Sequence, residues 1–287
     1  MSRQTGILAE IVRRKRWERD ILRDALRGQP RIDPASPWLP EPELLERAGR
    51  FLKAGGCERQ RRSLVAALQD PKRLTVIAEI KRSSPSAGRF AQWQDPTQLA
   101  EAYAASGAQA LSVLTDTHFF DGSPRFLGQC RAVFPGPVLR KDFLADEADL
   151  AISAALGADA VLLIVRLLGA QTAGMLRAAR CYDLEVLVEV HNQRELDLAM
   201  ACGASLMGIN NRDLDDFSVD LERSEQLMTQ IPSPIGVVSE SGIGTPEDAV
   251  RMRRAGADAI LVGQALAERD GEGLADLQIE QKRGHRR

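Results

Sequence analysis

The sequence predicts an α/β fold, a (β/α)8 TIM barrel preceded by an N-terminal helical extension. From residue 74 onward, eight short apolar runs alternate with helical stretches. A Gly-Ala pair comes before every second run. The length of 287 residues suits one barrel of roughly 250 residues plus an extension. These observations favour the barrel over an open doubly wound sheet of eight strands, which is the main structural alternative.

The first part of the chain, residues 1–72, has a helical rather than an alternating pattern. Apolar residues recur at helical spacing among arginines over 5–27, and Gly28 is the expected stop. The proline-rich stretch 30–42 cannot form a continuous helix. Two more helices are predicted over 42–54 and 58–69. We expect this extension to pack on a barrel formed by residues 73–270, with residues 271–287 as a frayed tail.

Eight segments of strand length are the predicted barrel strands. They are nearly continuous apolar runs, as in a parallel sheet that is covered on both faces. The segments between them are long enough for the crossover helices that parallel strands require. In chain order the strands are predicted at 75–80, 110–114, 137–142, 159–165, 185–190, 205–210, 235–240 and 258–263.

A weak internal repeat supports this count of strands. Gly107, Gly157, Gly203 and Gly256 are spaced 50, 46 and 53 residues apart, and an alanine follows each of them. They stand just before the second, fourth, sixth and eighth predicted strands, where a helix must end before the chain turns into the sheet. We therefore expect a left-handed backbone conformation at these four glycines.

Composition and charge argue against several classes of protein. The 38 basic and 40 acidic residues leave a formal net charge of -2, which indicates neither a nucleic-acid nor a membrane-surface partner. The cysteines and histidines lack zinc-ligand spacing, so no metal site is expected. No apolar run approaches the ~18 residues of a membrane span, and the N-terminus lacks the apolar core of a signal peptide. A reduced cytoplasmic location is the expectation.

Polar side chains collect at the C-terminal ends of the predicted strands, where barrel enzymes hold their active sites. A single charged residue there is explained equally well by a strand that ends at the surface. A group of mixed sign in apolar context requires mutual pairing when buried, and burial shifts pKa values in ways that suit acid–base chemistry. The residues are Glu79 and Lys81 (first strand), Lys141 (third), Glu189 (fifth), Asn210 and Arg212 (sixth), and Ser239, Glu240 and Ser241 (seventh).

The loop after the seventh strand, with the sequence Ser-Gly-Ile-Gly-Thr-Pro, predicts a phosphate site. Its Gly242 permits close approach of the backbone, and the Thr-Pro pair is typical of a helix start. In this fold, loops seven and eight commonly bind phosphate through backbone N–H groups at a helix N-terminus. Gly263 and Gln264 follow the eighth strand, and Ser84 in the first loop adds a hydroxyl. The alternative for the Ser-Gly-Ile-Gly segment is a simple turn.

Taken in chain order, these segments resemble the indole-3-glycerol phosphate synthase family. The resemblance covers about residues 6–268, including a similar start of the helical extension at 7–12. Departures are modest: Ala87 stands where the family often has a charged residue, Gln264 where serine, threonine or glutamate is common, and Leu64 where phenylalanine often packs. The matching motifs are 78–86, 112–115 with 119–123, 139–143, 187–191, 208–214 and 239–243.

The resemblance implies ring closure of 1-(2-carboxyphenylamino)-1-deoxyribulose 5-phosphate to indole-3-glycerol phosphate, with loss of carbon dioxide and water, in tryptophan biosynthesis. It makes Lys141 the proton donor to the ketone oxygen. Lys81, held by Glu79, would be the cation for the substrate carboxylate and, with Glu79, the acid for dehydration. Glu189 would stabilise the positive nitrogen and accept its proton. No metal or organic cofactor is implied.

We expect the protein to be a monomer or a weak homo-oligomer that binds a small phosphorylated substrate. Asn210 and Arg212 would orient Glu189 and the sugar hydroxyls, and Ser241 would contact the substrate. The implied walls around the aromatic ring are Phe120, Phe143 and Leu261, and the implied phosphate ligands are Ser84, Gly242, Gly263 and Gln264.

Two other functions remain open at this point. A different phosphate-binding barrel, such as a ketose-phosphate isomerase or epimerase, would rely on a carboxylate pair, a carboxylate with histidine, or a metal. His118 and His191 do not fall at the places such a site needs. A non-catalytic metabolite-binding barrel would lack acid–base residues, whereas both lysines and both glutamates are present.

Overall fold

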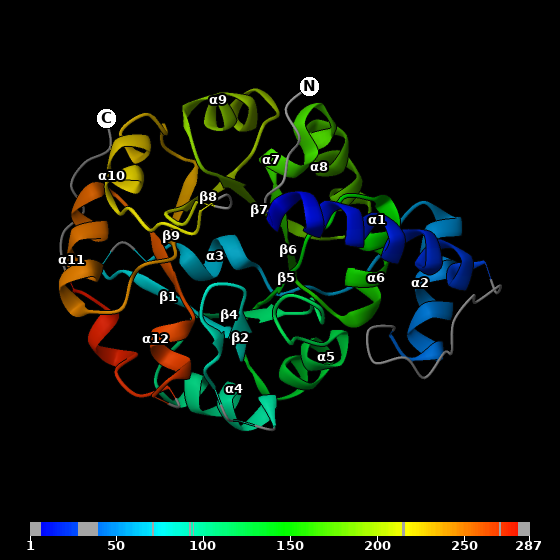
Figure 1. Ribbon diagram of the computed structural model, residues 1–287, viewed down its shortest axis with the longest axis horizontal. Helices are drawn as coiled ribbons and strands as arrows, with labels where there is room; N and C mark the ends of the chain where they lie inside the picture. Colours follow the sequence, from blue (N-terminus) through cyan, green and yellow to red (C-terminus); the bar gives the residue numbers. More distant parts are fainter. Residues whose placement is uncertain are drawn as a thin grey trace.

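The computed structural model describes residues 7–27, 40–70, 72–91, 93, 95–213, 216–269 and 271–280. Eight parallel strands form a closed barrel inside a ring of helices (Figure 1). Their order around the barrel follows the chain, and the last strand, β10, pairs with the first, β1. This is the arrangement that successive right-handed βα units produce. The predicted (β/α)8 fold class with an N-terminal helix is therefore confirmed.

Each barrel strand lies within one residue of its predicted bounds. A short hairpin in the loop after the first strand, formed by β2 (Ser83–Ser84) and β3 (Gly88–Arg89), was not predicted. The barrel strands are β1 (Thr75–Ile80), β4 (Ala110–Leu114), β5 (Val138–Lys141), β6 (Ala160–Ile164), β7 (Glu185–Val190), β8 (Leu206–Asn210), β9 (Gly236–Glu240) and β10 (Ala259–Val262).

Helices cover the outside of the barrel, and several of them end at the glycines of the internal repeat. Gly107, Gly157, Gly203 and Gly256 have φ values of 87, 91, 79 and 110°, so the left-handed conformation predicted for them is confirmed. The helices are α4 (Pro96–Ala105), α5 (Pro124–Val133), α6 (Glu147–Leu156), α7 (Val165–Leu168), α8 (Thr172–Cys181), α9 (Gln193–Ala201), α10 (Glu222–Met228), α11 (Pro246–Ala255) and α12 (Gln264–Ala267), with short 3-10 turns at Gly169–Gln171 and Ala275–Leu277.

The extension contributes three helices, α1 (Ile7–Leu26), α2 (Pro42–Ala54) and α3 (Leu64–Leu68). α2 matches its predicted bounds. The prediction of helix over 58–69 is wrong for 58–63, because the Ser63 side chain caps α3 and the preceding residues extend along the barrel. There, the Arg62 backbone N–H donates to Asp159 at 2.8 Å. Residues 5, 6 and 28–39, which fall in the predicted first helix, its stop and the proline-rich stretch, lie outside the described residues.

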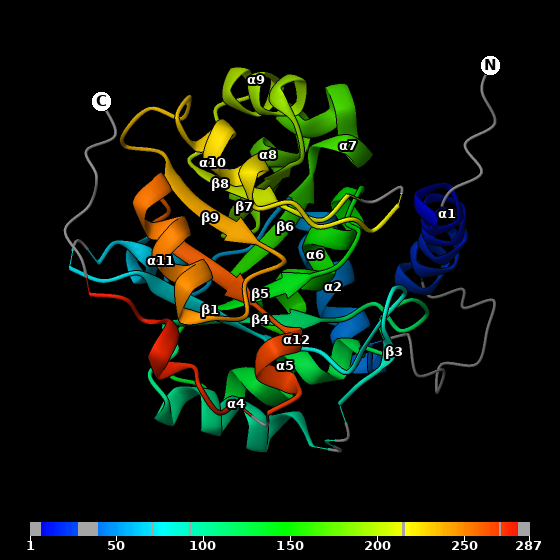
Figure 2. The same cartoon turned by 60° about the vertical axis from the view of Figure 1, so that its left-hand side comes forward.

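α3 closes the end of the barrel where the strands begin. Leu64 and Leu68 are fully buried among apolar side chains of the barrel interior, such as Ile77. The Ser63 hydroxyl donates at 2.7 Å to Glu185, the first residue of β7. By contrast, α1 stands on the side toward which the strand arrows point (Figure 2). The extension therefore covers one end of the barrel and borders the other.

The C-terminal segment packs against the barrel further than predicted. Leu274 and Leu277 are buried, and Glu280 forms an antiparallel bridge with Arg73. The prediction of a frayed tail from residue 271 is therefore wrong up to residue 280, because the two leucines three positions apart bury one apolar face. Residues 281–287 lie outside the described part.

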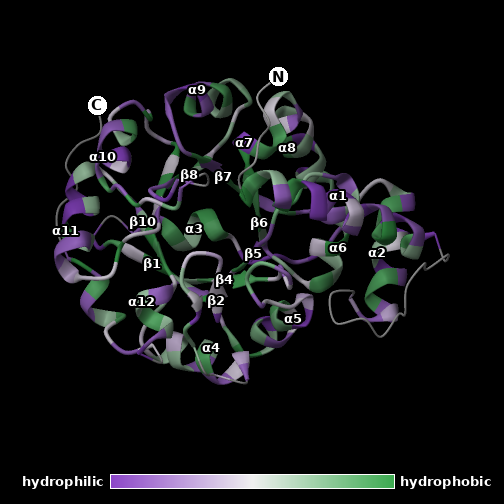
Figure 3. Cartoon of the chain, viewed as in Figure 1, coloured by the Kyte–Doolittle hydropathy of each residue, from purple (hydrophilic) through white to green (hydrophobic). Residues whose placement is uncertain are grey.

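Apolar side chains fill both the barrel and the layer between strands and helices. The strands are mostly hydrophobic, whereas the outer helices carry hydrophilic positions on one side (Figure 3). Each large apolar side chain that is fully buried stabilises the fold by about 1.5–3 kcal/mol. No helix in the part of the chain that the structure describes is long and apolar enough to cross a membrane.

Candidate active site

A cavity of about 370 Å³ opens at the C-terminal ends of the barrel strands. Ser239 and Glu240 of the predicted strand-end group are fully buried and do not line it. Every residue to which a catalytic or substrate-binding role was assigned does line the cavity, so the structure brings these residues together. They are Glu79, Lys81, Ser84, Phe120, Lys141, Phe143, Glu189, Asn210, Arg212, Ser241, Gly242, Leu261, Gly263 and Gln264.

Lys141 ends β5 and lies between two carboxylates. Its Nζ binds the carboxylate of Glu240 and lies 3.8 Å from Oε2 of Glu189. Burial alone would lower the pKa of Lys141, but the charges of Glu240 and Glu189 raise it above its ordinary value. Lys141 is therefore a persistent cation that points a proton donor at the cavity.

Lys81 and Glu79 stand two residues apart around the end of β1 and face the same cavity. The Lys81 Nζ lies 3.5 Å from Oε1 of Glu79 and 5.4 Å from the centre of the Phe120 ring. Burial lowers the pKa of Lys81, Glu79 raises it and Lys141 lowers it, and the net change is downward. Lys81 therefore releases its proton more readily than Lys141 does.

Glu189 is held as a carboxylate at the end of β7. The Asn210 amide donates to its Oε1 at 3.2 Å, and the Nε2 atom of His191 lies 3.3 Å from the same oxygen. Burial raises the pKa of Glu189, but contact with His191 and the charge of Lys141 lower it to about 2. The Glu189 carboxylate, which lines the cavity, is thus negatively charged at neutral pH.

His191, which the sequence analysis set aside, supports Glu189 from behind. Its Nδ1 lies 3.1 Å from Oε2 of Glu195, whose other oxygen accepts from Arg166 at 3.1 Å. Burial lowers the pKa of His191, but contacts with Glu189 and Glu195 raise it to about 9. A histidine two residues after a strand-end glutamate was the available signal, because both side chains then share one face of the chain.

Glu240 was predicted at a strand end, but the sequence assigned it no role in the site. It is fully buried at the end of β9, and its carboxylate binds Lys141. Burial raises the pKa of Glu240 to about 7, with the charge of Lys141 opposing and that of Glu189 adding to the shift. Glu240 lies beside the Ser-Gly-Ile-Gly loop, which the sequence associated with phosphate binding. A carboxylate at the end of a buried strand nevertheless indicated a partner of opposite charge.

Two glycines, one within β8 and one just after β10, make room for the buried carboxylates. A Cβ atom on Gly208 of β8 would collide with the carboxylate of Glu240. A Cβ atom on Gly263, just after β10, would collide with that of Glu79. Neither glycine has a positive φ, so their role is space rather than backbone freedom.

The loops after β9 and β10 present backbone groups to the cavity. Ser241 and Gly242 both have left-handed backbones, with φ values of 67 and 79°. The predicted helix start at Thr245 is present. The Oδ2 atom of Asp248 accepts hydrogen bonds from the backbone N–H groups of Gly244 and Thr245 at 3.1 and 3.0 Å. The first turn of α12, by contrast, has no side-chain cap, and both Gly263 and Gln264 line the cavity.

The opposite wall of the cavity is apolar. The rings of Phe120 and Phe143 have centroids 6.0 Å apart and planes inclined by 39°. Leu162 and Ile164 of β6 and Leu261 of β10 add further apolar side chains to the lining of the cavity. The arrangement suits a planar, apolar group of a substrate.

Arg212 lies at the rim rather than beside Glu189. Its guanidinium donates to the Phe217 carbonyl at 3.1 Å and reaches the Ser86 hydroxyl at 3.4 Å. The Arg212 backbone N–H donates to Oδ1 of Asn210 at 3.0 Å. Orientation of Glu189 therefore comes from Asn210 and His191, and Arg212 is placed to contact a substrate from the loop side.

The described part of the chain holds no group of three or more His, Cys, Asp or Glu side chains placed to bind a metal ion. The cavity is instead organised around lysine–carboxylate pairs.

Comparison with known proteins identifies the family of the chain. Residues 44–275 match the family model for indole-3-glycerol phosphate synthase. The synthase of Chlorobium phaeovibrioides is 48% identical over 194 residues, which cover 67% of this chain and 75% of that protein. That of Roseiflexus sp. is 46% identical over 215 residues, covering 71% of this chain and 80% of that protein.

Among solved structures, thiamine phosphate pyrophosphorylase from Pyrococcus furiosus superposes with a TM-score of 0.55. It is 19% identical, and the match covers 75% of this chain and 96% of that one. At this identity the likeness concerns the fold alone. The family model spans most of the barrel and the relatives share nearly half their aligned residues, and on these grounds the chain belongs to the indole-3-glycerol phosphate synthase family.

Proposed function

We propose that this protein catalyses the decarboxylative and dehydrative ring closure of 1-(2-carboxyphenylamino)-1-deoxyribulose 5-phosphate, giving indole-3-glycerol phosphate for tryptophan biosynthesis. It is then a carboxy-lyase that acts on a small phosphorylated substrate. The observation that carries the proposal is the meeting of Lys81, Lys141 and Glu189 in one cavity, between an apolar wall and a loop of backbone donors. Those features match the carboxylate, ketone, nitrogen, ring and phosphate of the substrate.

The first step is attack of the ring carbon on the ketone carbon. The ketone oxygen then becomes an alkoxide, which is a stronger base than an amine, so the Lys141 ammonium protonates it. The carboxylate of Glu240 keeps Lys141 charged and aimed before this transfer. Because its pKa is about 7, Glu240 can then bind a proton from solvent and pass it to Lys141. A positioned proton donor of this kind contributes ~10²–10⁴-fold to the rate.

The second step is loss of carbon dioxide. Ring closure leaves the substrate nitrogen positively charged, and the electron pair of the breaking carbon–carboxylate bond neutralises it. Lys81 holds the carboxylate until that bond breaks, and the apolar wall of Phe120 and Phe143 excludes water from it. Glu189, a carboxylate at neutral pH, stabilises the cationic nitrogen.

The third step is loss of water. The hydroxyl formed in the first step leaves with a proton, for which the Lys81 and Glu79 pair is the proposed acid. Its lowered pKa makes Lys81 a stronger acid than an ordinary ammonium group. Glu189 accepts the proton that restores the aromatic ring. The phosphate is proposed to bind the Ser84 hydroxyl and backbone N–H groups of the loops after β9 and β10.

One assay tests the proposal. The purified protein is incubated with the carboxyphenylamino-deoxyribulose phosphate, and indole fluorescence is followed while the product is identified by mass. Formation of indole-3-glycerol phosphate with release of carbon dioxide is expected. Folded protein that binds the substrate without turnover would instead indicate a metabolite-binding barrel, and an isomerised sugar phosphate would indicate an isomerase.

A further inference from the structure

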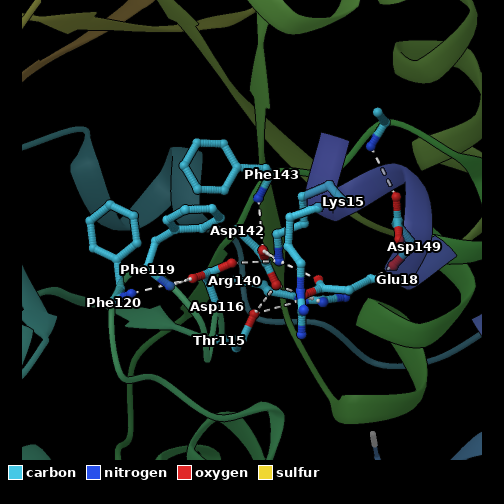
Figure 4. A network of polar contacts seen from close by, with 12 residues as sticks. Lys15, Glu18, Thr115, Asp116, Phe119, Phe120, Arg140, Asp142, Phe143 and Asp149 are labelled. Carbon is cyan, nitrogen blue, oxygen red and sulfur yellow. Dashed lines mark hydrogen bonds and ion pairs between the residues drawn. The ribbon is translucent and has the colours of Figure 1, made fainter. Parts of the chain in front are cut away.

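Lys15 of α1 is a buried cation that lies outside the cavity and is surrounded by carboxylates (Figure 4). Only 8% of the residue is exposed. Its Nζ lies 2.7 Å from Oδ2 of Asp116, 2.7 Å from Oδ1 of Asp142 and 3.0 Å from Oε2 of Glu18. Glu18 belongs to the same helix, whereas the two aspartates belong to two different barrel loops. The Lys15 Nζ therefore links α1 to the loop after β4 and to the loop after β5.

Asp116 shapes the loop that follows β4. Its second carboxylate oxygen, Oδ1, accepts the backbone N–H of Phe119 at 2.6 Å and that of Phe120 at 3.3 Å. Phe120 is one of the two rings on the apolar wall of the cavity. A shift of the Asp116 carboxylate therefore shifts the backbone that carries this ring.

Asp142 has the same relation to the loop that follows β5. Its Oδ1, the atom that binds Lys15, also accepts the backbone N–H of Phe143 at 2.8 Å. Its Oδ2 accepts from the Thr115 hydroxyl at 2.6 Å and from Arg140 at 2.9 Å. Asp142 is next in the chain to Lys141, so this carboxylate is tied to both the second ring and the proton donor.

We propose that Lys15 is a positioning residue for the active site, which holds together the two loops that carry Phe120 and Phe143. In this role α1 is part of the substrate site, because its cation sets the spacing of the two aromatic rings. The assignment rests on the proposed function, which places the substrate ring between those walls. The N-terminal helix α1 then contributes to the site although none of its residues lines the cavity.

Charge balance explains why this cation matters. Asp116 and Asp142 are both buried, and Lys15 is the cation they share. Without it, two carboxylates would face each other in a site of low dielectric, where like charges repel strongly. Asp142 keeps Arg140 as a partner, but Asp116 would have to move toward solvent or take up a proton. Either change displaces the backbone of the Phe120 loop.

The test compares Lys15→Met, Lys15→Arg and a control, Arg23→Met, in steady-state kinetics with the substrate named above. The rings contact substrate and transition state alike, so their displacement raises KM more than it lowers kcat. Lys15→Met is expected to raise KM about tenfold or more, and Lys15→Arg to recover most of that loss. Arg23→Met removes another bond of α1 to the barrel, to Asp146 of the α6 cap, and is expected to leave KM unchanged.

A second variant tests the contact without removing a buried cation. Asp116→Asn keeps an oxygen that can accept the N–H of Phe119, but it weakens the link to Lys15. Lys15 keeps Asp142 and Glu18 as partners, so no buried charge loses its last partner, and the variant is expected to fold even if Lys15→Met does not. Its KM is expected to rise, and the double variant Lys15→Met/Asp116→Asn is expected to add little to the larger single effect, because both changes break one contact.

Several outcomes would overturn this role. A folded Lys15→Met enzyme with the KM of the wild type would reduce Lys15 to a stabilising ion pair, as would an Arg23→Met variant with the same KM increase. Effects of Lys15 and Asp116 that multiply in the double variant would show that they act separately. A wild-type protein that makes no indole-3-glycerol phosphate would instead refute the proposed function, so the two failures are distinguishable.

Discussion

Single residues in this site owe their chemistry to the partners beside which they are buried. Two carboxylates raise the pKa of Lys141 against its burial, whereas burial lowers the pKa of Lys81, with the charge of Lys141 adding to the shift and that of Glu79 opposing it. Glu189 and Glu240 differ in the same way: the pKa of the first is lowered to about 2, and that of the second is raised to about 7. Environments that separate the pKa values of like groups allow one site to run acid and base steps.

Lys141→Ala and Glu189→Gln are each expected to reduce turnover by orders of magnitude, roughly the 10²–10⁴-fold that one positioned proton transfer contributes. The fold should survive, because loss of Lys141 leaves Glu240 free to bind a proton and become neutral. Indole-glycerol phosphate formation and circular dichroism, measured on the same samples, check both parts. Near-normal turnover in either folded variant would refute its assigned role.

His191→Gln is expected to flatten the pH dependence of thermal stability. The pKa of His191 is raised in the folded protein to about 9, so its stabilising contribution is full below the unfolded pKa of about 6.5 and is lost as pH rises through 9. Between pH 7 and 9 the folded state holds a proton that the unfolded state has released. Melting temperatures across this window should fall more steeply for the wild type than for the variant, and equal slopes would contradict the shift.

At the scale of elements, strand ends and their glycines determine where the site can form. Parallel strands in a closed barrel bring their C-terminal ends to one face, and the register pairs Asn210 of β8 with Glu240 of β9. Glycine at positions 208 and 263 leaves the space that the carboxylates of neighbouring strands fill. The site thus depends on small residues in one strand as much as on charged residues in the next.

Gly208→Ala is expected to lower kcat/KM by about tenfold or more, because the added methyl group displaces the Glu240 carboxylate and with it Lys141. Stability should change much less, since Glu240 can move toward the cavity. The matched control is Gly174→Ala in α8, where the new methyl group would meet no heavy atom within 4 Å beyond its chain neighbours and the backbone of its own helix. That control should keep full activity and gain up to about 1 kcal/mol of stability. Equal activities for the two variants would argue against a spacing role for Gly208.

At the scale of the whole molecule, the extension has two separable parts. α3 buries Leu64 and Leu68 under the barrel, whereas α1 meets the loops at the opposite end through Lys15. Covering the lower end is a matter of stability, because exposed interior side chains of the barrel would face water. Contact with the upper loops is a matter of substrate binding.

Truncation distinguishes the two parts. A chain that begins at Pro40 keeps α2 and α3 and is expected to fold, with a raised KM because Lys15 is gone. A chain that begins at Arg73 also loses Leu64 and Leu68, each worth roughly 1.5–3 kcal/mol of burial, and is expected to lose its cooperative thermal transition. Calorimetry and steady-state kinetics on both chains check the pair of expectations. Full substrate affinity in the chain beginning at Pro40 would show that α1 has no part in the site.

Much of this protein was predictable because its signals are local. Strand bounds follow from apolar runs, and helix ends follow from glycines such as Gly157 and Gly256, whose left-handed backbone is a property of one residue. The residues of the cavity followed from one topological rule, that polar groups at the C-terminal strand ends of a barrel converge. The short extent of α3 was not visible, because the bonds that hold residues 58–63 extended run to distant barrel carbonyls and carboxylates.

The sequence by itself determined the barrel, its strands and the membership of the site, since periodicity and strand ends are encoded within a few residues. Only the tertiary structure decided which groups pair. Lys141 binds Glu240, 99 positions away, and Lys15 binds two aspartates in other loops. The charge state of each buried group is a sum over neighbours that barrel closure brings within about 4 Å. These neighbours come together only in the folded chain. They decide which buried group acts as an acid, which acts as a base, and which cation, Lys15, positions the loops of the site.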